Sequence, residues 1–158
     1  MKITLFTANQ FRHNYLINLL SGVSNELYVV QENDTLYPGQ VQGHYPSSNI
    51  YKNYFSNVLK AQEKLFGKDY ISAKNLKLLS IKEGDINKCS MSFLKDFLKS
   101  DIYIVTGSSF IKGELAEFLI EKKALSIHMG LAPYYRGTDC NFWALFDNNP
   151  HLVGATIY

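Results

Sequence analysis

The stretch ALSIHMGLAPYYRG, from Ala124 to Gly137, contains the side chains best suited to chemistry. Ser126 and His128 lie two positions apart at the end of a short apolar run, so on a β-strand both side chains project from the same face. A histidine can accept a proton near neutral pH, and a hydroxyl can donate a hydrogen bond to developing negative charge. The spacing indicates a candidate acid–base site. The alternative is a structural histidine at the end of a strand.

Runs of β-branched, aromatic and leucine residues predict the strands that would position this pair. They cover residues 2–7, 27–30, 76–81, 102–105, 125–128 and 154–158. Apolar residues at helical spacing predict helices over 11–20, 51–66, 93–98 and 115–119. This order predicts a single α/β domain over residues 1–158, with a doubly wound, mostly parallel sheet and helices on both faces.

Two segments between the predicted strands and helices are candidates for a functional role. Residues 32–49 are rich in proline, glycine and serine and predict a long loop, of the kind that often carries function. The turn Gly107-Ser108-Ser109 follows the strand at 102–105. Ligands of doubly wound sheets bind outside the carboxyl ends of the strands, so we expect this turn to lie beside His128.

The composition limits the function classes. The 158 residues include 46% hydrophobic residues and carry a net charge of +2, without a dense basic stripe that would favour a nucleic acid. The N-terminal apolar run is too short for a secretory signal or a membrane span, so we expect a cytoplasmic protein that does not enter the membrane. Cys89 and Cys140 lack the spacing of metal ligands, which predicts free thiols and no metal site.

Common nucleotide motifs are missing. The turn after the first strand reads TANQFRHN, without the glycines of a dinucleotide fingerprint, and the chain has no Walker A motif. A plain nucleotide-binding domain is therefore disfavoured. The other histidines, His13, His44 and His151, have no matching partner in the sequence and are interpreted as structural.

The last fifth of the chain, about 33 residues, carries a composite motif. Its parts, in order, are Ile127-His128, Leu131, Pro133, Tyr135-Arg136-Gly137, Trp143-Ala144-Leu145, Asp147-Asn148 and Gly154-Ala155-Thr156-Ile157. This run resembles the signature of the formyltransferases that use 10-formyltetrahydrofolate, which include methionyl-tRNA, glycinamide ribonucleotide and sugar N-formyltransferases. The resemblance implies a Rossmann-like formyltransferase domain.

The resemblance also implies roles for individual residues. His128 corresponds to the catalytic histidine of the family, and Ser126 occupies the position of its asparagine. The turn after the fourth strand, together with a flanking leucine, corresponds to part of the folate pocket. The acceptor amine of the family approaches from the first turn and from the loop after the histidine. The matching folate residues are Ser108, Ser109, Phe110, Ile111 and Leu125, and the matching acceptor residues are Asn9, Gln10, Phe11, Met129 and Gly130.

This chain departs from the family pattern in two respects. Serine replaces an amide donor at position 126, and loss of one oxyanion donor typically costs about 10²- to 10³-fold in rate. The family aspartate, its closing strands and its final helix would lie beyond Tyr158, so we expect a shortened domain with weak or no activity.

The expected reaction is formyl transfer from 10-formyltetrahydrofolate, as co-substrate, to a small primary amine. A nucleotide-linked amino sugar is slightly favoured over aminoacyl-tRNA, which the modest charge disfavours, and over glycinamide ribonucleotide. The alternative is a non-catalytic ligand-binding or interaction module that has kept the fold.

Overall fold

The computed structural model describes residues 1–33, 49–67 and 70–158. In these ranges six strands form one sheet in the order β3-β2-β1-β4-β5-β6, in which β6 alone is antiparallel to its neighbour. The strands are β1 (Lys2–Ala8), β2 (Glu26–Asn33), β3 (Leu76–Lys82), β4 (Ile102–Val105), β5 (Leu125–Met129) and β6 (Ala155–Ile157). The predicted strands and the mostly parallel sheet are confirmed.

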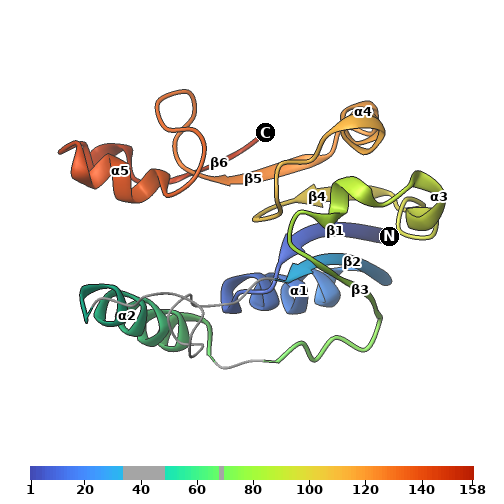
Figure 1. Cartoon of the computed structure of the whole chain (residues 1–158). Coiled ribbons are helices and arrows are strands. Elements are labelled where there is room, and N and C mark those ends of the chain that lie inside the picture. Colours follow the sequence, from blue (N-terminus) through green and yellow to red (C-terminus); the bar gives the residue numbers. More distant parts are fainter. Residues whose placement is uncertain (34–48, 68–69) are drawn as a thin grey trace.

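Helices connect the strands and cover both faces of the sheet (Figure 1). The α-helices are α1 (Phe11–Val23), α2 (Asn49–Phe66), α3 (Met91–Leu94), α4 (Gly113–Glu121) and α5 (Cys140–Phe146). Two short 3-10 helices are η1 (Asp85–Lys88) and η2 (Pro150–Leu152). In Figure 1, α1 lies on one face of the sheet, α3 and α4 lie on the other, and α5 lies beyond the far ends of β5 and β6.

The core consists of two apolar layers, one on each face of the central strands. Residues that alternate along β1 enter opposite layers: Leu5 packs with Ile17 of α1, whereas Phe6 packs with Leu115 and Leu119 of α4. Because both faces are covered, β1 and β2 are buried along nearly their whole length, as expected for the centre of a parallel sheet.

Two sequence predictions need correction. The predicted helix at 93–98 is shorter and begins earlier, because the Ser90 hydroxyl accepts a hydrogen bond from the Phe93 amide and starts α3 at Met91. The predicted loop at 32–49 is also too long: Glu32 and Asn33 extend β2, where they continue its pairing with β3, and Asn49 already belongs to α2. Residues 34–48 lie outside the described residues.

Candidate functional site

A cavity of about 800 Å³ lies at the carboxyl ends of β4 and β5. Its lining includes residues 105–111, together with Ser126, His128 and residues 136–138. The structure therefore brings together the two segments that the sequence predicts to be neighbours. This is the place at which ligands of doubly wound sheets bind, and the volume falls within the range of about 300–1,000 Å³ that is usual for small-molecule sites.

Most of the predicted catalytic and folate-contacting residues line this cavity. They are Ser108, Ser109, Phe110, Ile111, Ser126 and His128. The Phe110 side chain is 80% exposed, so its ring is available to a ligand. Leu125 is placed differently: it pairs with Ile104 in the sheet and is outside the cavity lining formed by the described residues.

The imidazole of His128 is held through one of its nitrogens. Nε2 lies 3.3 Å from the main-chain oxygen of Tyr135 and 3.6 Å from the sulfur of Cys140. A carbonyl oxygen only accepts, so the hydrogen bond to Tyr135 requires a proton on Nε2. In the neutral ring this leaves the lone pair on Nδ1, which is then the basic atom of His128.

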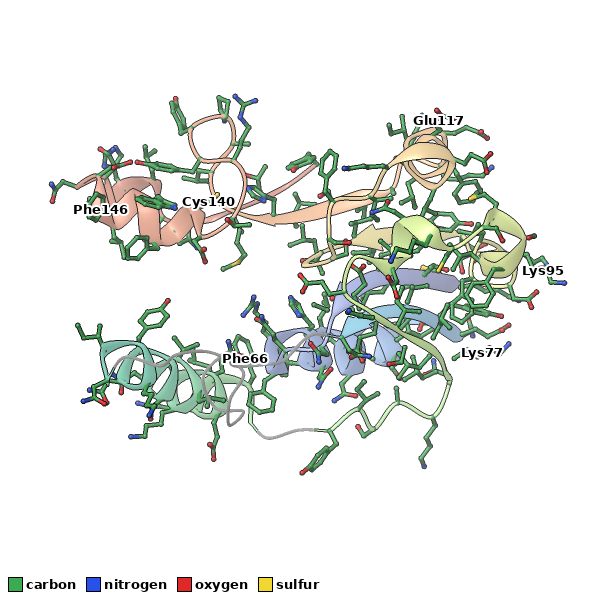
Figure 2. The ribbon with its side chains drawn as sticks, in the orientation of Figure 1. Phe66, Lys77, Lys95, Glu117, Cys140 and Phe146 are labelled. Carbon is green, nitrogen blue, oxygen red and sulfur yellow. The ribbon has the colours of Figure 1, made fainter. Side chains whose placement is uncertain are left out.

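Close packing around Gly130 fixes this arrangement. Gly130 has a φ of 144°, and a Cβ added there would lie 2.6 Å from the Cβ of Cys140 and 2.9 Å from the Tyr135 oxygen. Glycine is therefore required where the loop after β5 meets α5. Figure 2 shows Cys140 at the loop end of α5 and Phe146 at the other end. The buried thiol of Cys140 thus contacts the histidine without being part of the cavity lining among the described residues.

Ser126 is fixed through its backbone. Its amide donates to the Tyr158 oxygen at 2.7 Å, and the Tyr158 amide donates back to the Ser126 oxygen at 3.1 Å. Tyr158 also lines the cavity, and its ring centroid is 6.4 Å from that of His128. This antiparallel pairing leaves the serine hydroxyl as the polar group that Ser126 contributes to the cavity.

Sequence reasoning missed Glu32, which is 2% exposed and ends the buried part of β2. Its carboxylate accepts hydrogen bonds from the amide and the hydroxyl of Ser109, at 2.6 and 2.8 Å. A signal was available, because Glu32 follows the apolar run LYVV by two positions, and a glutamate is unusual at a buried strand end unless polar groups surround it.

His13 is the other buried polar residue near the cavity. Its side chain is 5% exposed and abuts Gly107, where an added Cβ would lie 2.4 Å from the imidazole Nε2. Burial, and to a smaller extent the positive charge of Arg12, lowers the pKa of His13 from 6.5 to about 4. His13 thus supports the turn as a neutral ring.

The buried His13 should make the folded protein sensitive to mild acid. The unfolded chain takes up a proton near pH 6.5 and the folded chain only near pH 4, so stability is lost as the pH falls through this window. Between pH 7 and pH 5 the loss is about 2 kcal/mol. Urea unfolding at several pH values should show this slope in the wild type and not in His13→Leu. His151 is exposed, so the control variant His151→Leu should keep the wild-type pH dependence. If the unfolding free energies of the wild type and His13→Leu fell in parallel with pH, His13 would not be the source of the acid sensitivity.

The predicted acceptor residues fall into two groups. Asn9, Gln10 and Phe11 lie at the start of α1, whereas Met129 and Gly130 lie at the end of β5. These five residues are not part of the cavity lining among the described residues. The Gln10 side-chain oxygen is buried and has no hydrogen-bond partner in the described part of the chain.

The described residues contain neither a metal-binding cluster nor a membrane-spanning helix. In residues 1–33, 49–67 and 70–158 there is no group of three or more histidine, cysteine, aspartate or glutamate side chains that could hold a metal ion. None of the described helices is long and apolar enough to cross a membrane. Both cysteines have free thiols, as the sequence predicts.

Comparison with known proteins gives matches at the level of structure. No family model matches the chain, and no curated protein matches it. Phosphoribosylglycinamide formyltransferase from Anaplasma phagocytophilum is similar, with a TM-score of 0.54 and 14% identity, over 100% of this chain and 63% of that one. Glycinamide ribonucleotide transformylase 1 from Geobacillus kaustophilus gives a TM-score of 0.56 and 13% identity, over 99% of this chain and 72% of that one.

A third solved structure is similar to this chain to the same degree. The phosphoribosylglycinamide formyltransferase from Brucella melitensis gives a TM-score of 0.53 and 16% identity, over 99% of this chain and 71% of that one. The similarity extends over the whole chain, while the chain spans less than two thirds of the Anaplasma protein. The fold expected from the resemblance is therefore confirmed, and the chain has the fold of the phosphoribosylglycinamide formyltransferases.

Proposed function

We propose that this chain carries the folate-binding and catalytic part of a formyltransferase that uses 10-formyltetrahydrofolate and a primary amine. The observation that carries the proposal is the cavity whose lining includes Ser126, His128 and the turn at residues 107–111. Its lining is largely apolar with a few polar groups, which suits a flat ring system held by a small number of hydrogen bonds.

The residues of the cavity can assist the expected reaction at two points. A C–N bond forms between the formyl carbon and the amine, the bond from the formyl carbon to the folate nitrogen breaks, the amine loses a proton, and the leaving folate nitrogen gains one. Nδ1 of His128 can accept this proton, and the Ser126 hydroxyl can donate a hydrogen bond to the formyl oxygen as negative charge develops there. We infer that the reaction is slow in this chain, because a serine hydroxyl is shorter than the amide it replaces.

The proposal also includes the class of amine that accepts the formyl group. We favour a small amine, with a nucleotide-linked amino sugar ahead of aminoacyl-tRNA and of glycinamide ribonucleotide. The net charge of +2 supports a small acceptor over tRNA, since tRNA binding depends on many phosphate contacts. The unpartnered oxygen of Gln10 at the start of α1 supports the first turn as one side of the acceptor site.

A second candidate is a binding module that has kept the fold and does not transfer a formyl group. The placement of Nε2 against Tyr135 and Cys140, and the serine at position 126, favour it. The two candidates differ in a single-turnover assay: an enzyme consumes bound 10-formyltetrahydrofolate when an amine is added, and a binding module does not.

Folate binding itself should be measured first. We expect 5-formyltetrahydrofolate, a stable analogue, to bind this chain in calorimetry, and we expect Phe110→Asp to weaken binding at least tenfold. The substitution places a charge where an exposed aromatic ring lines the cavity. Phe93→Asp is the matched control, since Phe93 is 59% exposed on α3. Absence of binding by the wild type, or an equal loss in the control, would contradict the proposed folate site.

A further inference from the structure

The turn between β4 and α4 is held in place from two neighbouring elements. The Glu32 carboxylate, at the end of β2, accepts the Ser109 amide at Oε2 and the Ser109 hydroxyl at Oε1. Asn87 of η1 holds the following residues: its amide nitrogen donates to the Phe110 oxygen at 2.9 Å, and its side-chain oxygen accepts the Lys112 amide at 2.8 Å. The turn is thus fixed by hydrogen bonds on both sides of Phe110.

Glu32 also holds the segment that leads into η1. Its Oε1 accepts the Gly84 amide at 2.9 Å, and Gly84 is the residue directly before Asp85 of η1. One buried carboxylate therefore connects the ends of β2 and β3 to the cavity turn. Hydrogen bonds to a carboxylate are roughly twice as strong as those between neutral groups, and a buried carboxylate without such donors would be strongly destabilising.

The contacts of Glu32 also determine which groups Ser109 can offer. The amide N–H and the hydroxyl proton of Ser109 are both donated to Glu32. Its side chain lines the cavity, and with its only proton committed, the hydroxyl oxygen can act toward a ligand only as an acceptor.

We propose that Glu32 is the positioning residue of the cavity: it fixes the turn at residues 107–111 and orients Ser109 so that its hydroxyl accepts a hydrogen bond from an N–H or O–H group of the ligand. The role of Glu32 in fixing the turn does not depend on which ligand binds, whereas its effect on folate binding rests on the proposed function. Glutamine cannot replace Glu32, because one of its terminal atoms is an NH₂ group that would face a donor at either Ser109 or Gly84.

Hydrogen exchange tests the positioning role without any ligand. We expect Glu32→Gln to speed exchange of amides in peptides covering residues 107–112 at least tenfold, while the amides of β1 keep wild-type rates. Glu121→Gln is the matched control, since it makes the same charge change on an exposed residue of α4. Wild-type exchange in the turn of Glu32→Gln would overturn the proposal. An equal loss of protection in β1 would also overturn it, because Glu32 would then serve general stability.

A second variant covers the case in which Glu32→Gln does not fold. Ser109→Ala removes the hydroxyl and leaves the amide bond to Glu32, so exchange in the turn should rise less than threefold. Calorimetry with 5-formyltetrahydrofolate should show binding weakened at least tenfold in Glu32→Gln and at least threefold in Ser109→Ala. Unchanged affinity in Ser109→Ala would overturn the acceptor role of Ser109. A wild type that binds no folate would refute the proposed function, while the exchange result would still decide the role of Glu32.

Discussion

Ser126→Asn is expected to raise the single-turnover rate of formyl transfer by about 10²- to 10³-fold, because it supplies a longer oxyanion donor from the same strand position. Ser126 lines the cavity on the same strand as His128, and its backbone is fixed by the two hydrogen bonds to Tyr158. The asparagine amide would therefore extend into the cavity from a rigid position. The assay follows loss of the formyl group from 10-formyltetrahydrofolate after an excess of amine is added.

Ser126→Asp is the control for this gain. Aspartate has almost the same size and shape as asparagine, but its carboxylate has no proton to donate at neutral pH. Ser126→Asp should therefore be no faster than the wild type. A gain of similar size in both variants would mean that shape, and not hydrogen-bond donation, limits the rate. No gain in Ser126→Asn would contradict the assignment of position 126 to the oxyanion.

His128→Asn is expected to lower the rate of formyl transfer by about 10²- to 10⁴-fold, the usual contribution of a general base. Asparagine keeps a polar group near the place of Nδ1 but does not titrate in this pH range. Folate affinity should change less than threefold, because the proposed folate contacts lie mainly on the turn at residues 107–111. Calorimetry with 5-formyltetrahydrofolate and the single-turnover assay together separate binding from catalysis.

His151 offers a control within the same chain. It is an exposed histidine of η2, so His151→Asn should keep both the rate and the folate affinity of the wild type. If His128→Asn retained the full rate of formyl transfer, His128 would be a structural residue and the proposed general base would be wrong. If it abolished folate binding as strongly as transfer, the histidine would act in binding and not as the base.

The order of strands and helices was predictable from the sequence, because hydrophobic periodicity is a local property. Runs such as KITLFT and IYIV are apolar at nearly every position, which indicates strands buried on both faces, and β1 and β4 are indeed adjacent at the centre of the sheet. The end of the second strand was less clear. Polar residues Gln31 and Glu32 resemble the start of a loop, and only their pairing with β1 and β3 shows that they continue the strand.

Local sequence patterns were enough to predict the fold class and the position of His128 at a strand end, next to the carboxyl end of the neighbouring strand. Which groups hold these side chains became visible only in the folded chain. Glu32 and Ser109 are 77 positions apart, Cys140 and His128 are 12 apart, and Gly107 and His13 come from different connections of the sheet. No local pattern encodes such contacts, since they arise only when parallel strands bring their carboxyl ends to one edge.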